Sequence, residues 1–461
     1  MNRRRLIIAV AIAGVVVGAV AWRARHRVRN MLEQRAENQA RNTLQISAAV
    51  RTWLEAPPLS VLDSDSPWWR ARINIDSTDP LPPLAWGEDE NIVWKTPLPG
   101  RGHSSPCVLG DAVFLTTAFD DDRSQRVMRI SLKSGEIVWD KEVHRGEFIY
   151  ANLKNSHASS TPATDGSLVF VSFALNGAVW LSAFTPEGVL QWQKEVGPYS
   201  SKEGFGASPL IVDNFVIVAA DNVGRSWLAA VHRATGEVVW RNPRGPGTSY
   251  GTPALFESDG ETQIVMSGLE RVTAYQLNDG AEIWRMPGPV LSASTPTVVD
   301  GILFVTGCTA ESGISAIEIG TPPKTLWNHK IKAEVPSPLY HDGKLYIAQD
   351  LGVLNCYEAK SGERLWRKRL GSNVYSSPIR IGNWILISVE DGRTFVFEAG
   401  SESEVLAENT LDAGVLATPV LTRGQLLIRT LDHLYCIGQV GADKSGDAVR
   451  PTENRTDTES E

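Results

Sequence analysis

Nine polar or aromatic side chains are the first candidates for chemistry, because they stand just before Ser-Pro or Thr-Pro dipeptides that recur along the chain. They are His103, Asn155, His157, Lys202, Glu203, Phe205, Tyr250, Asn373 and Tyr375. Imidazole, amide, carboxylate and phenol groups bind polar ligands through hydrogen bonds, and imidazole also ligates metals. The equivalent segments Leu291–Ser294 and Gly414–Ala417 are blander. The nine residues therefore predict a ligand-binding site, and they assign no catalytic role.

Several of these residues allow a second interpretation. His103 and His157 could contact a polar ligand or a metal, or each could be a loop histidine bonded to the neighbouring repeat, which we favour. Lys202 and Glu203 could clamp a substrate, although adjacent charges on a loop are more often a solvated surface. The acidic run 120–122 could bind a cation but is better explained as an exposed loop. We expect no metal site.

Other chemistry has no support in the sequence. No nucleophile, base and orienting residue show a familiar spacing, and no glycine-rich phosphate loop leads from a strand into a helix. The four cysteines, Cys107, Cys308, Cys356 and Cys436, lie far apart and form no CxxC pair, so we expect neither a zinc site nor a redox dithiol. Cys356 and Cys436 occupy equivalent places in two repeats, which favours a role as small buried apolar side chains.

The composition describes a well-cored protein that does not bind nucleic acid. Hydrophobic residues make up 42% of the chain and charged residues 21%, whereas disordered chains are less apolar and more charged. The net charge of −8 opposes phosphate binding, which needs clustered Lys and Arg.

A repeat organises the chain from Asn91 onward. The Ser/Thr-Pro dipeptides end at eight prolines: Pro106, Pro162, Pro209, Pro253, Pro296, Pro338, Pro378 and Pro419. A tryptophan ends the last strand of seven units, at Trp94, Trp139, Trp192, Trp240, Trp284, Trp327 and Trp366, and the eighth equivalent near Leu406 lacks it. Spacings of 39 to 56 residues, with four short apolar strands and Gly or Asp turns in each unit, predict the blades of an all-β, eight-bladed propeller.

The two ends of the repeat region complement each other. The first element is a lone tryptophan strand around Trp94, and the last is a third strand around Tyr435 with no tryptophan strand after it. We expect these segments to pair and close the ring, which removes exposed sheet edges. The recurring tryptophans should pack between blades, each with its indole N–H on a carbonyl oxygen.

Ring closure would bring the nine candidate residues together. In a propeller, the segment that enters each blade lines one mouth of the central channel, so these side chains should converge on a binding funnel. The Ser and Thr of the dipeptides recur in every blade and therefore are expected to be structural.

The N-terminus predicts a membrane anchor within residues 1–26. Three arginines precede Leu6–Trp22, a 17-residue run without charge that is at the short end of a spanning helix. The run could also be a cleaved signal peptide, but the arginines that follow it at once favour an uncleaved anchor. Both flanks are basic, so the orientation stays open. Gly14 and Gly18 have the GxxxG spacing that could let two such helices dimerise.

The remaining boundaries follow from composition. Residues 27–90 are expected to form a helical stalk followed by a Pro-rich linker, residues 91–438 the propeller, and residues 439–461 a disordered, acidic and polar tail.

The phrases Lys-Ser-Gly-Glu-Ile-Val-Trp139 and Lys-Ser-Gly-Glu-Arg-Leu-Trp366 resemble the pyrroloquinoline-quinone (PQQ) type of propeller repeat. This repeat occurs in quinoprotein alcohol dehydrogenases and in BamB-like propellers, and longer stretches around His103 and His157 resemble uncharacterised planctomycete-type relatives. The resemblance implies an eight-bladed PQQ-like propeller. The dehydrogenases hold PQQ under a disulfide of neighbouring cysteines and beside a calcium ion, and this chain has no neighbouring cysteines. It also lacks a cysteine before Cys107 that a lipid anchor of the BamB kind would need.

We therefore expect a non-enzymatic binding or scaffold module for protein or small-molecule ligands. It would be a single-pass protein of the inner (cytoplasmic) membrane, with the propeller on the extracytoplasmic, periplasmic side and no cofactor. The alternative is a PQQ-dependent oxidoreductase that acts on alcohols or sugars without the disulfide clamp.

Overall fold

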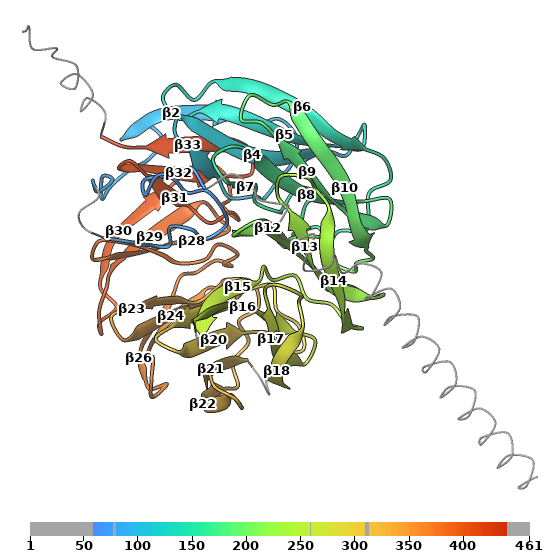
Figure 1. The fold of residues 1–461 in the computed structure, drawn as a ribbon. Helices are drawn as coiled ribbons and strands as arrows, with labels where there is room; N and C mark the ends of the chain where they lie inside the picture. Colours follow the sequence, from blue (N-terminus) through green and yellow to red (C-terminus); the bar gives the residue numbers. More distant parts are fainter. Residues whose placement is uncertain (1–58, 77–79, 259, 309–312, 440–461) are drawn as a thin grey trace, which may run out of the picture.

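The computed structural model describes residues 59–76, 80–258, 260–308 and 313–439. Within these ranges the chain forms eight separate β-sheets arranged in a ring, which confirms the all-β, eight-bladed propeller (Figure 1). No helix among the described residues is long and apolar enough to cross a membrane. The predicted anchor, the helical stalk and the C-terminal tail lie outside the described residues.

Each blade is an antiparallel sheet whose strands follow one another outward from the centre. Blade 1 holds β3 (Cys107–Leu109), β4 (Ala112–Phe119), β5 (Ser124–Ser131) and β6 (Ile137–Arg145); blade 2 holds β7 (Ala163–Thr164), β8 (Val169–Leu175), β9 (Ala178–Phe184) and β10 (Leu190–Pro198); blade 3 holds β11 (Leu210–Val212), β12 (Phe215–Ala220), β13 (Ser226–His232) and β14 (Val238–Gly245); blade 4 holds β15 (Ala254–Ser258), β16 (Glu261–Gly268), β17 (Arg271–Gln276) and β18 (Glu282–Pro287).

The second half of the ring repeats this order. Blade 5 holds β19 (Thr297–Val299), β20 (Ile302–Thr306), β21 (Ile314–Glu318) and β22 (Lys324–His329); blade 6 holds β23 (Leu339–His341), β24 (Lys344–Gln349), β25 (Val353–Glu358) and β26 (Arg364–Arg369); blade 7 holds β27 (Ile379–Ile381), β28 (Trp384–Ser388), β29 (Arg393–Glu398) and β30 (Val405–Thr410); blade 8 holds β31 (Val420–Thr422), β32 (Gln425–Arg429), β33 (His433–Ile437) and, from the start of the propeller, β2 (Ile92–Pro97).

The ring closes as the sequence predicts. Strand β2 pairs antiparallel with β33, with Trp94 opposite Cys436 and Lys95 opposite Tyr435. The fourth strand of the last blade therefore comes from the beginning of the repeat region. This pairing joins the two ends of the propeller and gives the last blade its fourth strand.

Six of the seven recurring tryptophans, all except Trp284, donate their indole N–H to a carbonyl oxygen of the next blade within the described residues. Trp94 donates to the carbonyl oxygen of Leu132 at 2.8 Å, and Trp240 donates to that of Leu277 at 2.9 Å. The same bond occurs at Trp139, Trp192, Trp327 and Trp366. A glycine of the next blade lies under the ring: a Cβ on Gly135 would stand only 2.7 Å from a ring atom of Trp94. Gly135 has φ +76°, a left-handed conformation that also favours glycine.

The Ser/Thr-Pro hydroxyls form a second, inner set of links. The backbone N–H of Ser105 donates to Thr161 Oγ1 of the following blade at 3.0 Å, and the N–H of Thr418 donates to Ser105 Oγ at 3.1 Å across the closure. Five further bonds of this kind join the innermost residues of adjacent blades. The recurring hydroxyls are thus structural, as their repetition suggests.

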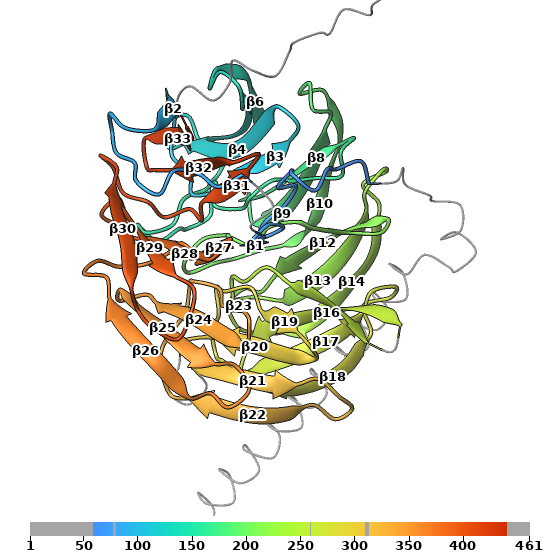
Figure 2. The same ribbon diagram turned by 90° about the vertical axis from the view of Figure 1, so that its left-hand side faces the viewer.

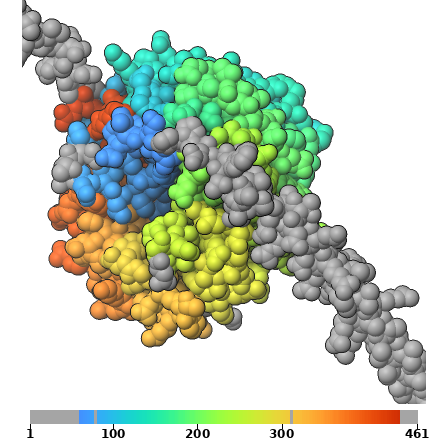
Figure 3. All heavy atoms as spheres, viewed as in Figure 1, coloured from blue at the N-terminus to red at the C-terminus, as the bar shows by residue number. Residues whose placement is uncertain are grey.

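Residues 59–76, which we name the plug segment, lie against the ring rather than free of it. Strand β1 (Asn74–Ile75) adds to the inner edge of blade 7 by pairing parallel with β27, as Figure 2 shows. Ser60 N donates to Asp165 O at 2.8 Å, and Asp65 accepts from Gly110 N at 2.9 Å and from Arg423 at 2.6 Å. Through these bonds, this half of the expected linker contacts blades 1, 2, 7 and 8, and further bonds join it to blades 5 and 6. Its blue atoms are visible on the face turned to the viewer in Figure 3.

Candidate functional site

The antiparallel order of the strands gives the propeller two different faces. In every blade the turn after the first strand lies at one end of the sheet, and the connection to the next blade lies at the other. The plug segment contacts the turn between the first and second strands in four blades, at Gly110, Asp165, Gly382 and Arg423. We name the end of the propeller that carries these turns the N-terminal face. We name the opposite end, where the blade-to-blade connections meet, the funnel face.

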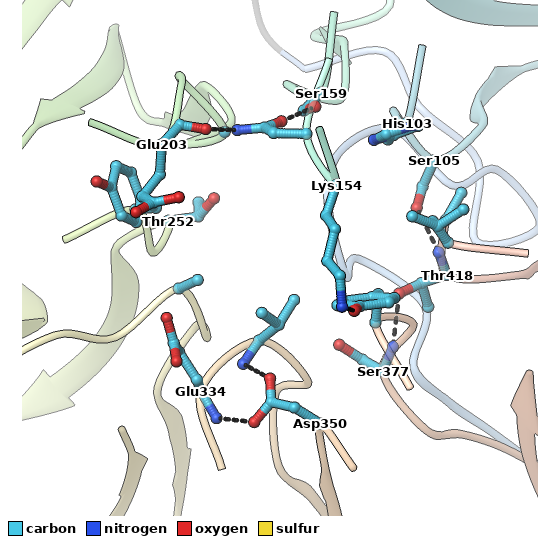
Figure 4. A pocket seen from close by; sticks show the side chains of 18 of the residues that line it. His103, Ser105, Lys154, Ser159, Glu203, Thr252, Glu334, Asp350, Ser377 and Thr418 are labelled. Carbon is cyan, nitrogen blue, oxygen red and sulfur yellow. Dashed lines mark hydrogen bonds between the residues drawn. The ribbon is translucent and has the colours of Figure 1, made fainter. Parts of the chain in front are cut away.

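A cavity of about 520 Å³ opens at the funnel face. Its walls are built by the connections that enter all eight blades and by the turn between β24 and β25. The Ser and Thr residues of the eight Ser/Thr-Pro dipeptides, which we name the inner ring, form the wall nearest the centre of the propeller. Six of them line the cavity: Ser105, Thr161, Ser208, Thr252, Ser377 and Thr418. Figure 4 shows the labelled side chains grouped around a common space.

Trp69 of the plug segment reaches this cavity from the N-terminal face. Its indole Nε1 donates to Thr295 Oγ1 at 2.8 Å, and the residue contributes to the cavity lining. Thr295 lies at the junction between blades 4 and 5. Among the described residues, this is the one junction where the Ser/Thr hydroxyl does not accept the backbone N–H of the preceding Ser/Thr-Pro dipeptide. The plug segment therefore supplies both the floor of the cavity and a donor for the hydroxyl that the neighbouring blade leaves unused.

Six of the nine candidate residues line the cavity: His103, Asn155, Glu203, Tyr250, Asn373 and Tyr375. The other three lie outside it. The His157 ring packs against Phe148 at a tilt, with ring centroids 4.1 Å apart, and Phe205 is buried against Tyr199. Lys202 is exposed to solvent.

Sequence reasoning missed several lining residues. Lys332 and Glu334 precede Ser337-Pro338 in the same way as the nine candidates precede their dipeptides, so the same signal would have found them. Asp350 and Leu351 come from a turn within blade 6, a kind of loop that the prediction did not consider. Trp69 belongs to no repeat, and no periodic pattern could have placed it.

The carboxylates of the cavity are held in place by neutral or charged donors. Asp350 accepts the backbone N–H groups of Glu334 at 2.8 Å and Val335 at 3.0 Å. Glu203 accepts from the Asn152 amide at 2.6 Å, and Glu334 pairs with Lys332 at 2.9 Å. Because such bonds fix the position of each acid before a ligand arrives, the cavity presents a preformed acidic wall.

The side chain of Lys154 extends into the cavity toward Tyr375. It belongs to the connection between β6 and β7, and its ammonium donates a hydrogen bond to the hydroxyl of Tyr375, which precedes β27. The ammonium also lies 5.1 Å from the centroid of the Tyr375 ring. The bond to Tyr375 raises the pKa of Lys154, which therefore carries a full positive charge at neutral pH.

His103 is held neutral in the cavity wall. Burial, together with the positive charges of Arg429 and Arg101, lowers the pKa of its imidazole to about 3. Its Nε2 is buried and has no hydrogen-bond partner among the described residues. A neutral imidazole can donate or accept one hydrogen bond at this corner but adds no charge.

The described residues do not match the PQQ site that the resemblance implies. All four cysteines are free, and Cys107, Cys356 and Cys436 are buried in different blades, so no disulfide of neighbouring cysteines can cover a quinone. No group of three or more His, Cys, Asp or Glu side chains in the described part of the chain is placed to hold a metal ion. The side chains of the cavity suit hydrogen bonding and charge pairing with a ligand.

We predict that His103 makes the protein sensitive to mild acid. The unfolded imidazole has a pKa of about 6.5, so between pH 6.5 and 3 the unfolded state binds more protons and folding loses stability as the pH falls. In His103→Gln, the slope of the free energy of unfolding against pH, measured by urea denaturation between pH 4 and 6, should decrease by up to about 1.4 kcal/mol per pH unit. An unchanged slope would show that His103 titrates normally in the folded protein.

Comparison with known proteins gives this fold relatives of two kinds. The chain is 24% identical to the outer membrane protein assembly factor BamB of Burkholderia pseudomallei (strain K96243), over 72% of this chain and 83% of the relative. Among solved structures, BamB from Moraxella catarrhalis has a TM-score of 0.55 at 17% identity, covering 76% of this chain and 98% of that one.

Quinohemoprotein alcohol dehydrogenase from Comamonas testosteroni has a TM-score of 0.59 at 13% identity, covering 90% of this chain and 86% of that one. At these identities the solved structures show a shared fold. The family described as outer membrane protein assembly factor BamB matches residues 84–224, 224–330 and 321–413. Since these matches span well over half of its length, the chain belongs to this family of PQQ-like β-propeller proteins.

Proposed function

We propose that this protein is a membrane-anchored binding module whose funnel face receives a segment of a partner protein on the extracytoplasmic side of the inner membrane. The exposed rim of the cavity carries this proposal. Leu153 and Leu351, the two most exposed large apolar side chains of the described residues, are 88% and 82% exposed, and each adjoins a charged lining residue in the sequence. Apolar side chains beside a polar cavity are typical of surfaces that bind other proteins.

The position of the plug segment supports an orientation. The first described residues of the plug segment lie on the N-terminal face, whereas the cavity opens on the opposite, funnel face. If residues 1–26 anchor the chain as the sequence predicts, the funnel face points away from the membrane surface. A partner can then approach the cavity without displacing the anchor.

The family relationship supports a role in the cell envelope. Its relatives are named as assembly factors for outer membrane proteins, so their work involves other polypeptides. For this chain we propose binding to a polypeptide, without an enzymatic step. Small ligands remain the second class of occupant for a cavity of about 520 Å³.

The alternative function is PQQ-dependent oxidation of an alcohol or sugar. The fold shared with the quinohemoprotein alcohol dehydrogenase favours it. Against it, the cysteines lie in separate blades and Trp69 fills the floor of the cavity from the N-terminal face.

Site-specific photo-crosslinking tests the proposed binding face. A photoreactive phenylalanine analogue at position 153 or 351 of the full-length protein in intact cells should give the same crosslinked polypeptide, identified by mass spectrometry. The control position is Val189, which is 57% exposed in the turn between β9 and β10 on the N-terminal face. Crosslinks at position 189 alone, or none at 153 and 351, would contradict the proposal.

Cofactor titration tests the alternative. Full-length protein in detergent, mixed with PQQ and Ca²⁺, should show no stoichiometric uptake of the quinone and no dye-linked oxidation of alcohols or sugars. A quinoprotein alcohol dehydrogenase treated in the same way is the positive control. Tight 1:1 uptake together with oxidation would replace the binding-module proposal by the oxidoreductase.

A further inference from the structure

We infer that the partner segment inserts a basic side chain, Lys or Arg, into the cavity and that Lys154 occupies this position while the partner is absent. The inference rests on the proposed function and specifies the chemistry of the occupant. Three features support it: how Lys154 is held, which charges surround it, and which apolar side chains flank it.

The loop of Lys154 is fixed, but its ammonium is only lightly held. The backbone N–H of Asn152 donates to Glu203 O at 3.1 Å, and the side-chain amide of Asn155 donates to the same oxygen at 2.8 Å, so the loop is anchored on both sides of residue 154. The ammonium itself has one neutral partner, the hydroxyl of Tyr375. Among the described residues it forms no ion pair within 4.0 Å. A single contact to a neutral phenol at an exposed site can be exchanged for another ligand at small cost.

The surrounding charges favour a cation in this place. Glu203, Glu334 and Asp350 line the same cavity, and the negative charges of Asp350 and Glu390 help to raise the pKa of Lys154. Of the lining acids, only Glu334 has a salt bridge to a lysine within the described residues, and that lysine is Lys332. Figure 4 shows Lys154 extended between the labelled acids, with Glu334 and Asp350 below it and Glu203 at the upper left. A guanidinium or ammonium from a partner would meet carboxylates that are already oriented.

The rim indicates that this cation belongs to a polypeptide. Leu153 directly precedes Lys154, and Leu351 directly follows Asp350, so an exposed leucine stands beside the cationic and the acidic side of the cavity. A free amine or a metal ion would leave both leucines in water. A chain segment with apolar residues around its Lys or Arg would cover them while its charge enters the cavity.

Peptide binding tests the inference on the full-length protein in detergent. The probe is a fluorescein-labelled peptide, Leu-Gly-Arg-Gly-Leu with blocked ends, and its matched control carries citrulline, a neutral isostere of arginine. Fluorescence anisotropy at low salt should show binding of the arginine peptide and much weaker binding of the citrulline peptide. Lys154→Met should tighten the arginine peptide on the order of three- to tenfold, and Glu334→Gln should weaken it by a similar factor.

Lys202→Met is the matched lysine control, because Lys202 is exposed on the next connection and does not line the cavity. It should leave binding unchanged. Equal affinity for the two peptides, or no gain in Lys154→Met, would overturn the inference. These outcomes would leave the crosslinks at positions 153 and 351 intact, so a failure of the basic-residue inference can be told apart from a failure of the binding-module proposal.

Discussion

The structure depends on one repeated hydrogen bond between neighbouring blades. The donor is the backbone N–H of the Ser or Thr in one Ser/Thr-Pro dipeptide, and the acceptor is the side-chain hydroxyl of the Ser or Thr in the dipeptide of the next blade. Seven such bonds, of 2.9 to 3.1 Å, run around the centre and include the closure between blades 8 and 1. Each adds only about 1 kcal/mol net, but a buried N–H left without a partner costs more than that. At the eighth junction Thr295 accepts from Trp69 instead. The plug segment thus belongs to the inner ring as much as the blades do.

This ring determines where chemistry can occur. The hydroxyls have the same role in every blade except at Thr295, so they set the spacing of the connections and do little to distinguish them. Differences begin three to seven residues earlier, where Lys154, Glu203 or Glu334 enters the cavity from a separate connection. An asymmetric site can therefore arise on a nearly symmetric fold, because the loops vary while the residues that hold them in register do not.

The fold could be predicted from the sequence because the pattern of each blade is repeated. The site could be predicted only in part, because its residues differ from blade to blade. Eight Ser/Thr-Pro dipeptides and the lone strand around Trp94 were sufficient to predict the blade number and the pairing of Trp94 with the strand of Tyr435. Of the nine candidate side chains, six lie at the cavity, as expected from the rule that connections line the channel. The rings of His157 and Phe205 contact other aromatic rings instead, and Lys202 is exposed to solvent. Trp69 escaped prediction because its position is set by a contact 226 residues away in the chain, to Thr295.

Native-state hydrogen exchange of the ring amides tests this account most directly. If the inner ring is closed, the N–H groups of Ser105, Ser208 and Thr418 should exchange only through global unfolding, at the slowest rates in the protein, whereas the N–H of Thr252, which has no hydroxyl partner among the described residues, should exchange faster. Rapid exchange at Ser105 and Thr418, the residues that join the last blade to the first, would mean that the ring opens there and would remove the basis for a preformed funnel.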